Sequence, residues 1–97
     1  MTNNKSIAVD YSDAKLRTLI EEYITRQKTE FTFKGVCSYV LYWAMEEGRT
    51  AEADKTLYES DKLAETDCKR IRGILEQIEN EERIIATIGD KYRVAGQ

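Results

Sequence analysis

The chain has 97 residues, of which 41% are hydrophobic and 34% charged, and its formal net charge is −3. This length suits a single domain with one hydrophobic core, and the apolar share argues against general disorder. The acidic balance weakens the case for nucleic-acid binding, because Lys and Arg supply most of the attraction to phosphates. No apolar run approaches the roughly 20 residues of a membrane span, so we expect no membrane partner.

The residue types also argue against an enzyme. The chain has no histidine, which removes the usual general base and any histidine-activated nucleophile. With two cysteines and no histidine, a four-ligand structural zinc site is excluded, and neither a GxGxxG motif nor a P-loop occurs. We therefore expect no catalytic activity, no cofactor and no metal. The lack of an apolar signal sequence at the start predicts a cytoplasmic location, in which the two cysteines are expected to be reduced.

The first predicted elements are a polar arm and an amphipathic helix. Residues 1–11 are polar around a small apolar island, which predicts a flexible arm or a short edge strand; residues 12–97 then form the domain. Ser12 is a suitable N-cap for a helix over about 13–28. Its buried stripe follows the helical period at Leu16, Leu19, Ile20, Tyr23 and Ile24.

The next predicted elements are a short strand and an apolar helix. Phe31, Thr32 and Phe33 alternate in polarity and predict a strand that could pair with a later hairpin. A helix follows at about 35–47, with one apolar stripe formed by Val36, Tyr39, Val40, Trp43 and Ala44. Its other side is also apolar, at Cys37, Leu41, Tyr42 and Met45. A helix that is apolar nearly all round is buried by neighbours, so it is either a homodimer interface or the central helix of the core.

The second half of the chain predicts further helices. Gly48 ends the preceding helix as a left-handed cap, and residues 49–59 form either a short helix capped by Thr50 or a loop. Ser60 can cap a short helix over 61–65 with Leu63 buried. Thr66 can cap a longer helix over 66–80, with Asp67 favourably placed in its first turn. The buried stripe of that helix is Ile71, Ile74, Leu75 and Ile78.

The strongest local pattern is a C-terminal β-hairpin. Residues 84–88 are mostly β-branched and apolar, and residues 91–95 alternate in polarity. Gly89 and Asp90 between them form a two-residue turn, in which glycine permits the positive φ of a type II′ turn. Two basic residues, Lys91 and Arg93, follow the turn at the start of the second strand.

Residues 60–95 resemble the C-terminal half of a winged helix-turn-helix domain. The resemblance rests on the Ser60 start, the Thr66-capped helix, the Arg83-Ile-Ile transition and the wing from Gly89 to Val94, and it covers about a third of the chain. It implies an α+β, mostly α, winged-helix-like fold of three to four helices with a C-terminal β-hairpin and room for a short third strand. The helix-turn-helix pair has two possible registers: 35–47 followed by an oversized turn, or 61–65 with 66–80. We prefer the second, because its spacing is compact.

By that resemblance the chain is a small DNA-binding protein, a dimeric transcriptional regulator of double-stranded DNA. Helix 66–80 would be the recognition helix, with its exposed N-terminal residues in the major groove. The implied contacts are Thr66, Lys69, Arg70 and Arg72 on the helix and Lys91 and Arg93 on the wing. The alternative is a protein-interaction module or homodimeric adaptor, which the acidic charge favours. Glu76 and Glu79 on the same helix would repel phosphates.

Overall fold

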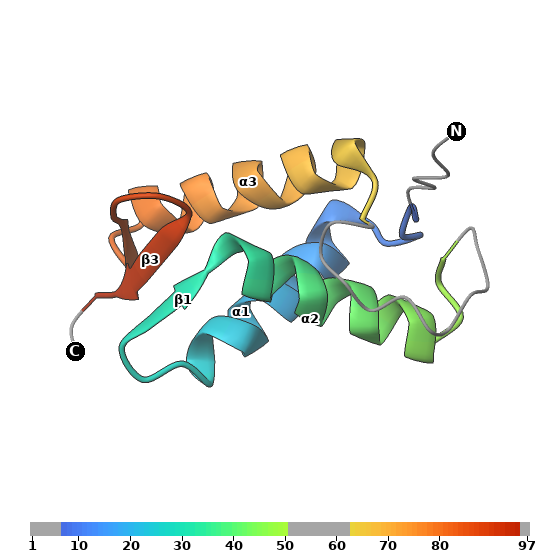
Figure 1. Ribbon diagram of the computed structural model, residues 1–97, viewed down its shortest axis with the longest axis horizontal. Helices are drawn as coiled ribbons and strands as arrows, with labels where there is room; N and C mark the ends of the chain where they lie inside the picture. Colours follow the sequence, from blue (N-terminus) through green and yellow to red (C-terminus); the bar gives the residue numbers. More distant parts are fainter. Residues whose placement is uncertain (1–6, 51–62, 96–97) are drawn as a thin grey trace.

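The structure, a computed structural model, describes residues 7–50 and 63–95 (Figure 1). It is mixed α and β, mostly helical, with a three-stranded antiparallel sheet in the order β1-β3-β2. The predicted fold class is confirmed, and the layout is consistent with a winged helix. Its elements are α1 (Asp13–Thr25), β1 (Glu30–Thr32), α2 (Phe33–Glu46), α3 (Glu65–Asn80), β2 (Ile84–Ala86) and β3 (Lys91–Val94).

Side chains of the preceding residues cap the first two helices. The Ser12 side chain accepts a hydrogen bond from the Lys15 amide at the start of α1, as predicted. At the start of α2, Thr32 does the same for Gly35, so this helix begins at Phe33 rather than at residue 35. Helix α1 ends at Thr25, three residues before the predicted end.

Helix α2 ends in the predicted left-handed glycine cap. Gly48 has φ +70°, its amide donates to the Met45 carbonyl, and the Arg49 amide donates to the Ala44 carbonyl. These two bonds are the Schellman pattern, which satisfies carbonyls that the helix end would otherwise leave unpaired. Residues 51–62, including Ser60 and most of the stretch predicted as a helix or loop, lie outside the described residues.

The start of α3 differs from the prediction. The helix begins at Glu65, its N-cap is Ala64, and no side chain caps it, so the assignment of Thr66 as a cap is wrong. Leu63 is buried as expected, but it lies in a parallel bridge with Ile7 and not in a short helix. Since Glu65 already belongs to α3, the described residues of the predicted 61–65 helix do not form a separate element. Among the described elements, α2 is followed by α3, as in the first register, and the separate helix at 61–65 that the preferred second register needs is not seen in its described residues.

Residues 7–11 are part of the folded domain, which corrects the expectation of a flexible arm for this stretch. Ile7, Val9 and Tyr11 are buried and the residues between them are exposed, which is the two-residue period of a strand. Ile7 bridges to Leu63, and Val9 bridges to Thr50. The segment therefore connects the end of α2 to the start of α3.

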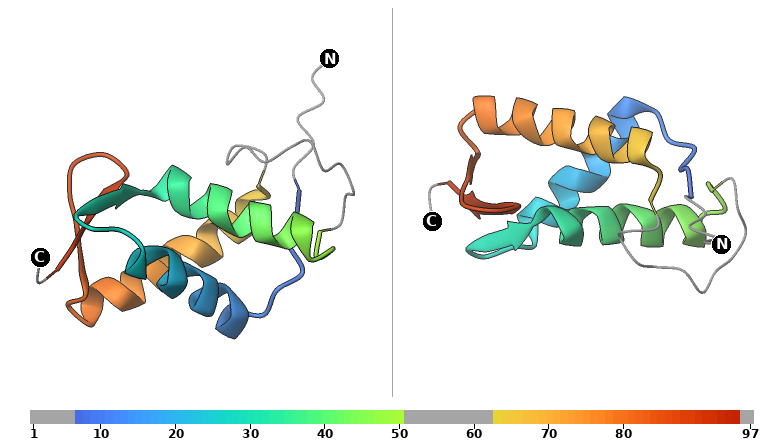
Figure 2. Two further views of the ribbon diagram at one scale, coloured as in Figure 1. Left: turned by 90° about the horizontal axis from the view of Figure 1, so that it is seen from below. Right: turned by 45° about the horizontal axis from the view of Figure 1, so that its top comes forward.

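Helix α2 is the central helix of the core. It contacts both α1 and α3, and α1 also contacts α3, so the three helices cover one another (Figure 2). Cys37, Leu41 and Met45 are each at most 2% exposed within the single chain, so they lie in its core and not on its surface. Only Tyr42 of the predicted interface is exposed, at 42%. The apolar second side of α2 is explained by α3 packing against it.

The sheet lies at the C-terminal end of α3 (Figure 1). The predicted third strand is confirmed, because β1 pairs with β3 and sets Phe31 opposite Tyr92. Their rings stack with centroids 5.3 Å apart. The Thr87 amide donates to the Lys91 carbonyl, so three residues, 88–90, make the turn, one more than predicted. Gly89 has φ +72°, and the expected positive φ is confirmed.

Candidate nucleic-acid interface

The six residues predicted to contact DNA fall into three groups, which differ in their element and in their exposure. Thr66, Lys69 and Arg72 are exposed on α3, and Lys91 and Arg93 are exposed on β3, whereas Arg70 is half-buried. Lys69 and Arg72 line a hollow between α3 and the hairpin of residues 84–94. The other residues that line this hollow are Gly73, Glu76, Glu79 and Tyr92.

Arg70 is engaged inside the protein. Its guanidinium donates to Asp13 at 2.8 Å, to Asp67 at 2.9 Å and to the Tyr11 carbonyl. Asp67 is only 4% exposed and also accepts a hydrogen bond from the Val9 amide at 2.9 Å. This partly buried cluster joins α3 to α1 and to residues 7–11. Because its donors are used here, Arg70 is not part of the candidate interface.

Arg72 is held at the surface by an aromatic ring and a carboxylate. Its guanidinium carbon lies 3.8 Å from the centroid of the Phe33 ring. Its Nη2 lies 3.3 Å from each carboxylate oxygen of Asp90, in the hairpin turn. The hydrogen bond that the guanidinium donates to Asp90 raises the pKa of Arg72. The contact joins α3 to the hairpin while both side chains remain about half exposed.

Lys91 and Arg93 face away from the hollow. Successive side chains of a strand point to opposite faces, and Tyr92 between them is buried on the inner face. Arg93 is flanked across the sheet by Glu30 of β1 and Ile85 of β2. The basic residues of the hairpin and those of α3 therefore lie on two adjoining surfaces rather than on one.

Charge also changes sign along the exposed side of α3. Lys69 and Arg72 occupy its N-terminal half, and Glu76 and Glu79 follow in its C-terminal half, all on the rim of the same hollow. Gly73 lies between the two pairs and has open space where a Cβ would be. An anion at this surface is therefore favoured only near the first two turns of the helix.

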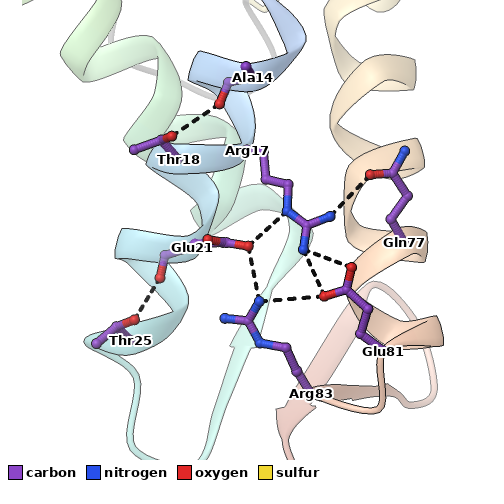
Figure 3. Close-up of polar contacts among 8 residues, drawn as sticks. All are labelled: Ala14, Arg17, Thr18, Glu21, Thr25, Gln77, Glu81 and Arg83. Atoms are coloured by element: carbon purple, nitrogen blue, oxygen red, sulfur yellow. Dashed lines mark hydrogen bonds and ion pairs between the residues drawn. The ribbon is translucent and has the colours of Figure 1, made fainter.

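A ring of four charged side chains fixes the position of α3 on its opposite side (Figure 3). Arg17 of α1 bonds Glu21 at 2.8 Å and Glu81 at 2.7 Å, and Arg83 bonds Glu21 at 3.0 Å and approaches Glu81 at 3.6 Å. Bonds from Arg17 and Arg83 hold the pKa of Glu21 below its usual value, and Arg17 does the same for Glu81. Since Arg83 directly precedes β2, the ring orients α3 and the hairpin against α1.

Other chemistries find little support in the described residues. Burial, with a smaller contribution from the Cys68 thiol, raises the pKa of Cys37 to about 12, so it is a poor nucleophile. Residues 7–50 and 63–95 contain no cluster of three His, Cys, Asp or Glu side chains that could hold a metal ion. Within these same ranges, no helix combines the length and the apolar character needed to cross a membrane.

Sequence reasoning found the exposed basic residues but missed the partners that decide their use. From the sequence, the basic residues of α3 could also pair with nearby acids, but Asp67 is predicted only as a favourable first-turn acid and Asp90 only as a turn residue, so neither is identified as the partner of a particular arginine. The spacing of Asp67 and Arg70 at i and i+3 is the one available signal, since such side chains are neighbours on a helix. Asp90 and Arg72 are 18 residues apart, and their contact depends on the fold.

No family model, no curated protein and no solved structure matches the chain. The winged-helix-like layout thus comes from the order of the elements and of the strands alone. Function has to be inferred from this layout and from the side chains that it exposes.

Proposed function

We propose that the protein binds duplex DNA through the N-terminal half of α3 and the hairpin, as a small transcriptional regulator. The observation that carries the proposal is the exposure of Lys69 and Arg72 on α3 beside a basic hairpin, in a winged-helix-like layout. Helices of this kind enter the major groove with their N-terminal residues against the base edges. Fold alone does not imply DNA binding, so the proposal depends on these side chains.

The first turns of α3 suit a duplex best. Thr66 and Lys69 are exposed there, and the helix dipole adds partial positive charge at this end. Thr66 can hydrogen-bond a base edge, whereas Lys69 and Arg72 are suited to guanine edges or phosphates. A duplex that crosses α3 near its N-terminus stays clear of Glu76 and Glu79.

The hairpin supplies contacts to the flanking backbone. Lys91 and Arg93 are exposed on the outer face of β3, so they reach phosphates beside the groove that α3 would occupy. With Lys69 and Arg72 they make four basic contacts. If these four cations neutralise three or four phosphates, the logarithm of the binding constant falls with the logarithm of salt concentration with a slope of about −3 to −4.

The test is fluorescence anisotropy of a labelled random-sequence duplex, titrated with protein from low to physiological salt. We expect salt-sensitive binding that Lys69→Glu weakens at least about tenfold, as in the loss of a direct phosphate contact together with an added repulsion. Lys15→Glu is the matched control, because Lys15 is exposed on α1 and its reversal changes the net charge equally. Circular dichroism and thermal unfolding confirm that both variants are folded.

The result that overturns the proposal is a lack of binding by the wild-type protein at low salt. Equal losses in Lys69→Glu and Lys15→Glu contradict the assignment to α3, since they report net charge alone. A loss confined to Lys69→Glu supports it.

The second candidate function is a protein-interaction module, and the exposed apolar residues of the hairpin favour it. Ile88 in the turn is 93% exposed and Ile85 on the outer face is 49% exposed. Such side chains gain free energy when a protein surface covers them. If the hairpin joins two copies of the chain, sedimentation will detect a concentration-dependent dimer that Ile88→Ser converts to monomer, with no DNA bound at low salt.

A further inference from the structure

We propose that Lys69 and Arg72 form a binding position for a backbone phosphate, and that the Asp90 carboxylate occupies this position in the free protein. The inference rests on the proposed DNA binding and adds a residue that lowers the affinity for DNA. Asp90 would act as an internal competitor, which a phosphate must displace before the hairpin side of α3 can close on DNA.

The Arg72 guanidinium is prepared for an anion before any ligand arrives. The Phe33 ring beneath it is 9% exposed and therefore rigidly packed, and it lies 3.8 Å from the guanidinium carbon. Stacking on a ring uses the face of the guanidinium and leaves the N–H donors at its edge for an oxyanion. Little conformational freedom is then lost when a phosphate binds these donors.

Lys69 lies one helical turn before Arg72 and lines the same hollow. Side chains at i and i+3 are neighbours on a helix surface, so both cations can contact one phosphate group. Glu76 and Glu79 line the other half of the hollow and repel an anion there. The phosphate position is thereby restricted to the N-terminal half of α3.

The contact between Asp90 and Arg72 is weak enough to be exchanged. Both oxygens lie 3.3 Å from Nη2, longer than the 2.7–2.9 Å typical of charge-assisted hydrogen bonds. The Asp90 side chain is 62% exposed, whereas Asp67, which binds Arg70 at 2.9 Å, is 5% exposed. Solvent therefore competes for the Asp90 carboxylate and is nearly excluded from that of Asp67.

The backbone of Asp90 stays fixed while its side chain is free to move. The Phe33 amide donates to the Asp90 carbonyl at 2.7 Å, which ties the turn to the start of α2. Rotation of the carboxylate away from Arg72 therefore needs no change in the hairpin. Once displaced, the carboxylate remains close to the bound phosphate and repels it, so Asp90 lowers the affinity both by competition and by repulsion.

The experiment compares Asp90→Asn with Glu76→Gln in the anisotropy titration at low salt. Both changes remove one negative charge from the surroundings of the hollow, but only Asp90 contacts Arg72. We expect Asp90→Asn to tighten binding about three- to tenfold, as expected for loss of an exposed ion pair and a nearby like charge. Glu76→Gln, by contrast, should tighten binding by less than about twofold.

A double-mutant cycle separates competition at Arg72 from general charge. In the Arg72→Gln background the carboxylate has no guanidinium to occupy, so Asp90→Asn should lose most of its effect on binding. Thermal unfolding of each variant confirms that the hairpin is retained.

The outcomes distinguish this inference from the proposed function. If the wild-type protein binds DNA but Asp90→Asn and Glu76→Gln have equal effects, or the Asp90→Asn gain persists without Arg72, the inference is wrong and the function stands. If the wild type does not bind at low salt, the proposed function and the inference that rests on it are both wrong. Binding by Asp90→Asn that exceeds that of the wild type and depends on Arg72 supports the inference.

Discussion

The two sides of α3 use the same basic stretch in opposite ways. Arg70 and Arg72 are two residues apart, which places them about 200° apart around the helix axis. On the side of α1, Arg70 binds two carboxylates and a carbonyl, and one of these carboxylates, Asp67, is buried. On the side of the hairpin, Arg72 binds one exposed carboxylate at longer distance. The first arrangement stabilises the fold, and the second leaves a cation open to exchange.

The side of α3 that faces α1 is also joined at its far end by the ring of Arg17, Glu21, Glu81 and Arg83 (Figure 3). The charges on this side are thus satisfied within the protein. The charges on the side of the hairpin are only partly satisfied within the protein. Because of this difference, the hairpin side is the candidate interface. Mutations on the α1 side should act on stability, and mutations on the hairpin side should act on binding.

The largest expected effect is that of Asp67→Ala. It leaves the Val9 amide and one Arg70 donor without their buried acceptor, which costs about 3 kcal/mol of unfolding free energy. Urea unfolding followed by circular dichroism measures the loss. Asp13→Ala is the control: it also removes a partner of Arg70, but Asp13 is 77% exposed, so we expect a loss below about 1 kcal/mol. If Asp67→Ala and Asp13→Ala lose similar amounts of unfolding free energy, the burial of Asp67 does not determine its contribution to stability.

The parts of the fold that could be predicted from the sequence are those that depend on local periodicity. The apolar spacing of Leu16 to Ile24 and of Ile71 to Ile78 predicted α1 and α3, and the alternation in residues 84–95 predicted the hairpin. The glycine cap at Gly48 was also predictable, because only a positive φ ends the helix in this way.

What could not be predicted depends on tertiary contacts. The apolar second side of α2 has the same pattern whether a partner chain or α3 covers it, and only the fold decides that Leu41 and Met45 are core residues. Periodicity does separate Arg70 from Arg72 on the helix surface. It does not show that Asp13 and Asp67 enclose the first, or that Phe33 and Asp90 hold the second.

A smaller, stabilising effect is expected from Gly73→Ala, on the ridge between the two sides of α3. Apart from the adjoining residues and backbone of α3 itself, no atom lies within 4 Å of the position of the new methyl group, so the gain in helix propensity is about 1 kcal/mol. Thermal unfolding measures it. If DNA covers this ridge, the same variant will bind DNA more weakly although it is more stable. A stable variant with unchanged affinity would place the duplex away from the ridge.

A gain of about 0.5–1 kcal/mol is expected from Glu82→Gly, where α3 turns toward the hairpin. Glu82 has φ +64°, a left-handed conformation that strains a residue with a Cβ. Its amide donates to Glu79 and the Arg83 amide donates to Ile78, the same cap that Gly48 forms at the end of α2. The measurement is the urea midpoint, and Glu82→Ala is the control, since it removes the charge but keeps the strain. An equal gain in both variants would assign the effect to charge.

The smallest effect is expected at the ring, because its side chains are between 28% and 44% exposed and solvent screens them. The pKa values of Glu21 and Glu81 are held below their usual 4.5, so their contribution is present above that pH and is lost as the pH falls through the lowered values. The double variant Glu21→Gln, Glu81→Gln should therefore lose a little stability at neutral pH and unfold less steeply below about pH 4.5. Thermal midpoints against pH measure this, and high salt should reduce the difference from wild type. If the thermal midpoint falls with decreasing pH in the same way in the double variant and in the wild type, the ring orients α3 without stabilising it. The contacts of the Arg70 cluster would then be the charged contacts that stabilise the packing of α3 on α1.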